Sequence, residues 1–223
     1  MMTNLCRGLA LTAMLCCLVP EAASAAPSSE SGSGSGSGQF SLFGDASLWT
    51  FWRIPLGVQL TSDAAADEPF AGISFEPKVK GNQTFTLDDL TSLSTILWVT
   101  EGGIGGGSPR FSIGLDEDGD GEADNSVFVY VGDAPNFTQG TGLIFTGNLL
   151  TKTDLRVDTS QIGGTFYDTY ENAIELAGDA AVVSVDLVVD SGWSFEEGVQ
   201  SVLVFDVQVN KTKLNLRKLT APN

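Results

Sequence analysis

Two long segments near the C-terminal end alternate apolar and polar residues, and this pattern constrains the fold more than any other. From 182 to 189, and again from 201 to 209, an apolar residue recurs at every second position. Successive side chains of a β-strand point to opposite faces. The period of two therefore predicts two long strands, each with one face on a core and one face in water.

Shorter runs rich in Val, Ile, Phe and Trp occur along much of the chain, bounded by Gly, Asp, Asn and Ser. Together with the two long segments, they predict strands at residues 47–51, 72–75, 96–100, 110–115, 127–131, 181–189, 199–209 and 213–216. This content of strands predicts an all-β fold, an antiparallel β-sandwich of jelly-roll type. An open barrel is the alternative.

Helical spacing is rarer than strand spacing. Thr169 and Gly178 can cap a helix whose apolar face holds Tyr170, Ala173, Ile174 and Ala177. Residues 86–93 can form a helical turn with acidic residues near its start. We therefore expect one or two short helices beside the sheets.

The N-terminal end has the features of an exported protein. Residues 1–25 contain Arg7, an uncharged apolar run at 8–19 and the small residues Ala23-Ser24-Ala25, as in a secretory signal peptide. This run is too short to span a bilayer, so we expect a secreted, extracellular protein with no membrane span. All three cysteines lie in the predicted signal peptide. Residues 26–38, with four Ser-Gly repeats, predict a disordered linker, and residues 39–223 a single β-sandwich domain.

The charged residues exclude several classes of function. The chain has 11 Lys and Arg against 28 Asp and Glu, no histidine, and a formal charge of −17. Without histidine, it has no Ser-His-Asp triad and no histidine-ligated metal. The acidic excess argues against binding nucleic acid, which requires basic residues that displace counterions. It also argues against adhesion to anionic lipid.

Residues 116–124 carry six acidic side chains. Carboxylates at the first, third, fifth and ninth positions, with Gly121 at the sixth, match the first part of a calcium-binding loop. The twelfth position is Val127 rather than glutamate, and predicted strands flank the loop, so we expect a metal-bound hairpin instead of an EF-hand. The predicted Ca²⁺ ligands are Asp116, Asp118, Asp120, Glu122 (by its carbonyl) and Asp124.

Aromatic residues near turns are candidates for contact with a ligand, and those in strands are expected in the core. The predicted ligand-binding residues are Tyr167, Tyr170, Trp193 and Phe195, and the predicted core residues are Trp49, Phe51, Trp52 and Trp98. Glu196 and Glu197 lie beside aromatic residues, as in a sugar site, but neighbouring strand residues face opposite ways and cannot form a catalytic pair alone. Asp154, Arg156 and Asp158 predict a row of surface ion pairs.

Several short motifs occur in a fixed order over about the last 120 residues. They include residues 106–111 (GGSPRF), the acidic loop, residues 166–170 (FYDTY) and residues 188–193 (VVDSGW). In this order of motifs the chain resembles an uncharacterised group of exported microbial proteins. The resemblance implies an extracellular β-sandwich similar in shape to carbohydrate-binding modules, and it assigns no catalytic residues.

Three functions remain open from the sequence. The first is a calcium-stabilised, non-catalytic sandwich that binds an extracellular polysaccharide or cell-surface polymer. The second is a polysaccharide-active enzyme, a hydrolase or lyase on a concanavalin-like sandwich. The third is a structural matrix or surface-layer protein. The absence of a nucleophile with a base favours the first.

Overall fold

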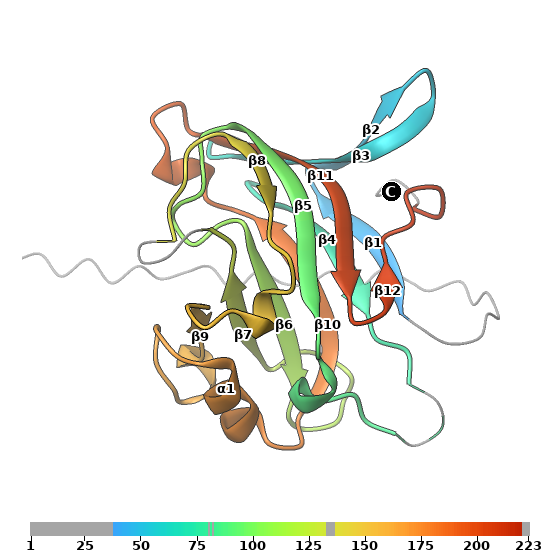
Figure 1. Ribbon diagram of the computed structural model, residues 1–223, viewed down its shortest axis with the longest axis vertical. Coiled ribbons are helices and arrows are strands. Elements are labelled where there is room, and N and C mark those ends of the chain that lie inside the picture. Colours follow the sequence, from blue (N-terminus) through green and yellow to red (C-terminus); the bar gives the residue numbers. More distant parts are fainter. Residues whose placement is uncertain (1–37, 80, 82, 133–136, 220–223) are drawn as a thin grey trace, which may run out of the picture. The chain divides into compact units, whose positions relative to one another are not determined.

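The computed structural model describes residues 38–79, 81, 83–132 and 137–219. These residues form two antiparallel sheets that enclose one apolar core (Figure 1). Sheet A has the strand order β1-β4-β10-β6-β7-β9, and sheet B has the order β2-β3-β11-β5-β8, with β12 paired to β11. The predicted signal peptide and nearly all of the predicted linker lie outside the described residues.

The strands of sheet A are β1 (Gln39–Gly44), β4 (Ala71–Glu76), β10 (Ala181–Val189), β6 (Arg110–Asp116), β7 (Asn125–Tyr130) and β9 (Val157–Asp158). Those of sheet B are β2 (Ala46–Phe51), β3 (Ile54–Asp63), β11 (Val199–Val209), β5 (Leu93–Glu101), β8 (Gly142–Phe145) and β12 (Thr212–Lys213). The helices are α1 (Tyr170–Ala177) and the 3₁₀ turns η1 (Leu87–Asp89), η2 (Leu149–Thr151), η3 (Ser160–Ile162) and η4 (Gly192–Ser194). Each predicted strand overlaps an observed one, whereas β1, β3, β8 and β9 were not predicted.

Eight strands pair in the order of a jelly roll. Along the chain they are β3, β4, β5, β6, β7, β8, β10 and β11. The first pairs with the last, the second with the seventh, the third with the sixth and the fourth with the fifth. This is the winding of a double-sheet jelly roll. It confirms the predicted fold, and the two separate sheets exclude the open barrel.

Strand β11 lines the core with alternate residues, and a bulge interrupts this alternation. Its alternation changes phase at a bulge between Val204 and Asp206. An extra residue in one strand reverses the facing of the side chains that follow. The bulge leaves Phe205 on the outer face, while buried valines continue on both sides of it: Val202, Val204, Val207 and Val209.

The helix α1 begins and ends where the sequence predicts. The Thr169 side chain accepts a hydrogen bond from the backbone N–H of Asn172 at 3.1 Å, and Gly178 follows the last turn. Tyr170 is buried, and its hydroxyl donates to the Leu87 carbonyl at 2.8 Å, which joins α1 to η1. Among the described residues, no helix has the length and apolar character needed to cross a bilayer.

Candidate metal centre and exposed apolar face

The acidic loop connects β6 to β7, two neighbouring antiparallel strands of sheet A. Asp116 is the last residue of β6 and is buried, whereas Asp118 and Asp120 are exposed. One carboxylate oxygen from each of the three lies within 4.8 Å of the other two. Three convergent carboxylate oxygens can hold a metal ion, and hard divalent cations prefer such ligands.

Backbone hydrogen bonds fold the loop around these carboxylates. Asp116 accepts from the N–H groups of Gly119 at 2.6 Å and Gly121 at 2.9 Å. Both glycines have positive φ, +84° and +91°, a conformation that L side chains rarely adopt. Asp118 in turn accepts from the N–H of Asp120 at 3.1 Å. The glycines therefore allow the sharp turn that brings the three aspartates together.

The other two predicted ligands lie differently. Asp124 Oδ2 accepts from the backbone N–H of Glu117 at 2.7 Å, so this carboxylate closes the loop from its far end. Glu122 is exposed, and its backbone N–H donates to Asp120 Oδ1 at 2.8 Å. Neither belongs to the cluster of three carboxylates. An open hollow of about 690 Å³ lies beside the loop and is lined by residues that include Asp116, Glu117, Asp118, Gln161, Leu176 and Asp179.

The outer face of sheet B carries exposed apolar side chains in register across its strands. Leu203 of β11 lies beside Trp98 of β5, and Trp98 lies beside Leu143 of β8. Two residues earlier in β5, Ile96 lies beside Phe145 of β8. The exposed fractions are 48% for Trp98, 53% for Leu143 and 67% for Phe145.

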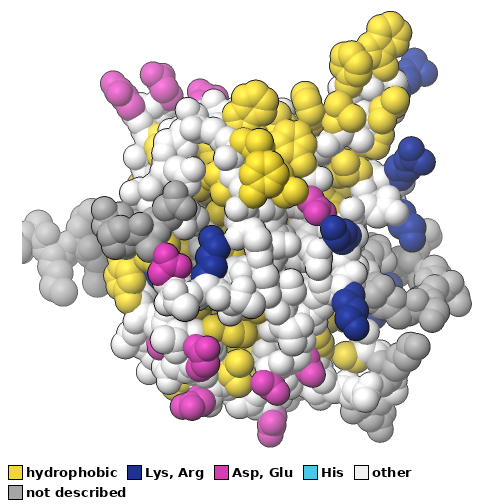
Figure 2. Space-filling view, viewed as in Figure 1, with side chains coloured by type: hydrophobic (Ala, Val, Ile, Leu, Met, Phe, Trp, Pro, Cys, Tyr) yellow, Lys and Arg dark blue, Asp and Glu magenta, His cyan; other side chains and the backbone are white. Residues whose placement is uncertain are grey.

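The same surface continues across β11 to β2. The rings of Trp49 and Phe205 meet edge-on, with centroids 6.1 Å apart. Gly57 faces Trp49 from β3, and a Cβ at this position would lie 2.7 Å from the Val204 carbonyl oxygen. A glycine is therefore required for the close passage of β3 beside the Val204 carbonyl. We call Trp49, Phe205, Trp98, Leu143 and Phe145 the apolar row; Figure 2 shows hydrophobic side chains gathered at this end of sheet B.

The exposure of four aromatic residues corrects the prediction that they lie in the core. Trp49 is 38% exposed, Phe51 62%, Trp52 84% and Trp98 48%. In β5 the residues at the alternate positions fill the core instead, for example Leu97 beside Trp98, whereas Phe51 and Trp52 lie at the end of the β2–β3 hairpin, where their neighbours are exposed as well. Both faces of these strands are apolar, so hydrophobicity alone could not tell the inner face from the outer one.

The structure does not bring the four predicted ligand-binding aromatics together. Trp193 is 69% exposed on η4, and Phe195 packs against Gly102 and Gly103. Tyr167 is 63% exposed near β9. Tyr170 is a correction: its ring is buried in the core and its hydroxyl is used by η1, so it presents no surface to a ligand.

Arg156 and Asp158 are also placed differently from the prediction. Both are buried, at 6% and 4% exposure, so they do not form a surface row with the exposed Asp154. The Arg156 guanidinium lies 3.8 Å from the ring centroids of both Tyr130 and Phe166. Burial, followed by the charge of Asp158, raises the pKa of Tyr130 to about 12. These contacts fix the edge of sheet A by cation–π stacking.

Two of the sequence motifs meet at one end of the sandwich. Arg110 of the first motif forms a bidentate pair with Asp190 of the last, at 2.7 and 2.6 Å. Ser108 Oγ donates to the buried Gln200 side chain at 2.7 Å and accepts from the Asp190 N–H at 3.1 Å. The motifs therefore hold the strand ends together. Glu196 and Glu197, beside this network, are exposed.

Comparisons with protein-family models, with curated proteins and with solved structures gave no significant match to this chain.

Proposed function

We propose that this protein is an exported, calcium-stabilised, non-catalytic β-sandwich that binds an extracellular polysaccharide on the outer face of sheet B. The observation that carries the proposal is the apolar row. Soluble proteins rarely leave large contiguous apolar patches in water, and such patches mark binding surfaces. Aromatic rings offer flat apolar faces that suit the C–H faces of sugar rings.

The arrangement of the row fits an extended polymer better than a compact ligand. The row takes side chains from β2, β11, β5 and β8, which succeed one another across sheet B with β3 between β2 and β11. Neighbouring strands lie about 4.8 Å apart, so the row extends over several strand widths. A chain of sugar rings laid across the strands can contact each ring of the row in turn.

Calcium is the ion we assign to the acidic loop. Its three convergent ligands are all carboxylate oxygens, and Ca²⁺ accepts six to eight oxygen ligands in flexible geometry. Backbone carbonyls and water can complete such a shell. Residues 1–25, with their apolar run and small-residue end, support export to a compartment where calcium is abundant.

A glycan array in the presence of Ca²⁺ tests the proposal. We expect retention of one class of polysaccharide, with loss of binding in Trp98→Ala and unchanged binding in Phe166→Ala, an exposed aromatic outside the row. Absence of binding to every glycan would overturn the proposal. Release of reducing ends or unsaturated products from a bound polysaccharide would favour the enzymatic alternative instead.

A further inference from the structure

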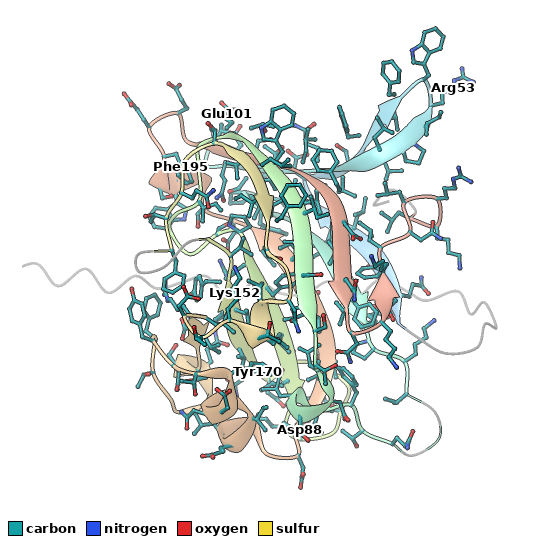
Figure 3. The ribbon with its side chains drawn as sticks, in the orientation of Figure 1. Arg53, Asp88, Glu101, Lys152, Tyr170 and Phe195 are labelled. Carbon is teal, nitrogen blue, oxygen red and sulfur yellow. The ribbon has the colours of Figure 1, made fainter. Side chains whose placement is uncertain are left out.

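The β2–β3 hairpin projects beyond the rest of sheet B. Among the described strands, β3 pairs with β11 only from Val58 to Asp63, and the part of the hairpin from Ile54 to Gly57 pairs only with β2. Figure 1 shows this end extending away from the sandwich, and Figure 3 places Arg53 at its end. A two-stranded ribbon without further packing is only marginally stable in water.

The end of this hairpin is apolar on both faces. Trp49 through Ile54 are all exposed, and successive residues of a strand point to opposite sides. The exposed fractions are 62% for Phe51, 84% for Trp52, 56% for Ile54 and 40% for Leu56. A flat partner such as a sugar chain touches one face of a ribbon, so it leaves half of this surface in water. An occupant that surrounds the end covers both faces.

The turn of the hairpin consists of two residues that disfavour the positive φ it requires. Trp52 and Arg53 connect β2 to β3, and their φ angles are 51° and 64°. Two-residue hairpin turns with positive φ favour Asn-Gly, because other L residues cost about 1–2 kcal/mol each in this conformation. The chain accepts this cost and thereby presents an indole and a guanidinium at the outermost point.

Positive charge gathers on the same edge of the sheet. Since β5 occupies one side of β11, both β3 and β12 lie along the other side, at Val199–Val204 and Gln208–Val209. Residues 207–219, the basic segment, contain four cations and no acid, and Arg53 is the only charge between residues 46 and 62. Figure 2 shows Lys and Arg side chains on the flank below the hairpin. Lys213 lies 3.7 Å from Asp206. Among the described residues, Lys211, Arg217 and Lys218 have no carboxylate partner.

We propose that the hairpin end, Phe51 to Ile54, inserts into the interface of an anionic lipid membrane while the basic segment contacts the lipid headgroups. Aromatic rings beside Arg and Lys are the combination that favours this interface. The net charge of −17 argues against such binding only if the charge is evenly spread, and residues 46–62 and the basic segment, neither of which contains an acid, show that it is not.

The backbone limits how far the hairpin can enter. β2 is an edge strand of sheet B, so its outward N–H and C=O groups have no strand partner in the described part of the chain. Such groups cannot be left unpaired in hydrocarbon. Insertion therefore stops at the turn, where Trp52 reaches the interfacial layer and Arg53 extends to the headgroups.

Vesicle flotation of the chain as secreted by its expression host tests the proposal. With phosphatidylcholine vesicles containing phosphatidylglycerol, we expect binding that weakens with salt and is lost with phosphatidylcholine alone. Trp52→Ala should weaken it about tenfold or more, and Lys211→Gln about fivefold. The matched controls, Trp193→Ala and Lys152→Gln, should bind as the parent does, because both residues are exposed and lie off the hairpin and the basic segment.

The test separates this proposal from polymer binding. Trp98→Ala should lose the polysaccharide and keep the vesicles, and Trp52→Ala should do the reverse. Equal loss in Trp52→Ala and Trp193→Ala, or no flotation with anionic vesicles, would overturn the proposal. Self-association in light scattering that Trp52→Ala abolishes, without lipid, would assign the hairpin to a second copy of the chain and also overturn it.

Discussion

The two sheets present different rows of side chains to the outside. On sheet A, neighbours in register across β1, β4, β10 and β6 are Ser41, Ser74, Asp186 and Ser112. On sheet B, neighbours in register across β3, β11, β5 and β8 are Gln59, Leu203, Trp98 and Leu143. Strand alternation accounts for both inner faces. Among the described strands, the large apolar side chains that are exposed all belong to sheet B, and such exposed apolar area favours binding of a partner.

The largest expected difference between the faces is in binding. Trp98→Ala should weaken polysaccharide binding about 30-fold, since buried aromatic anchors carry about 2 kcal/mol or more of binding energy. Isothermal titration against the polysaccharide found on the array measures this. Its control on the other face, Ser112→Ala, should leave affinity unchanged. Equal effects on both faces would show that the apolar row is not the site.

Metal removal should affect sheet A more than sheet B. If Ca²⁺ is present at about 100 times its dissociation constant, its loss removes about 2.7 kcal/mol of stability, or about 5–10 °C in Tm for a chain of this length. Hydrogen exchange should then speed up more in β6 and β7, which flank the loop, than in β5 and β8.

The controls for this prediction are single substitutions. Asp118→Asn should reproduce the effect of the chelator, and Asp67→Asn, an exposed acid in another loop, should not. A Tm unchanged by EDTA, with no heat on Ca²⁺ titration, would contradict the metal assignment. An equal increase of exchange in both sheets would show that the ion stabilises the whole sandwich and has no additional local effect on the loop.

Sheet A also contains Asp186, whose carboxyl group is destabilised in its charged form by burial. Burial raises the pKa of Asp186 to about 6, and its Oδ1 has no hydrogen-bond partner among the described residues. The unfolded chain ionises near 3.8, so the folded protein binds the proton more tightly and loses stability as pH rises from about 4 to about 6. Above that window the penalty stays constant.

Asp186→Asn should therefore stabilise the protein by about 2 kcal/mol above pH about 6 and have no effect below pH about 4. The residue is partly exposed, which lowers this figure from the full shift. Urea melts of parent and variant across the pH range measure the difference. A constant difference at every pH would mean that packing, and not ionisation, distinguishes the two side chains.

The sequence was sufficient for elements whose signal is local. The alternation of β10 and β11, the caps of α1 and the turn of the acidic hairpin each depend on neighbouring residues, and all three are present. β3 was missed because Pro55 and Gly57 interrupt its pattern, and it is held by pairing with β11, far along the chain. The exposure of Trp98 was also unpredictable, because a strand with two apolar faces does not reveal which face meets the other sheet.

The smallest expected effect concerns the turns at the ends of the two sheets. The β6–β7 turn of sheet A places glycine at its positive-φ positions, whereas the β2–β3 turn of sheet B places Trp52 and Arg53 there. Arg53→Gly should stabilise the protein by about 1 kcal/mol, because glycine adopts positive φ without a steric penalty. Thermal melting measures the change.

The control for the turn is Thr50→Gly, a substitution in the same hairpin at a residue without positive φ. Glycine there should destabilise by about 0.5–1 kcal/mol, since it only adds freedom to the unfolded chain. Opposite signs for the two glycines would establish strain at Arg53, and equal destabilisation would contradict it. If Arg53→Gly stabilises the protein and weakens vesicle binding, the hairpin end is retained for its partner and not for the fold. The β6–β7 turn of sheet A, with glycine at its positive-φ positions, serves the fold without such a steric cost.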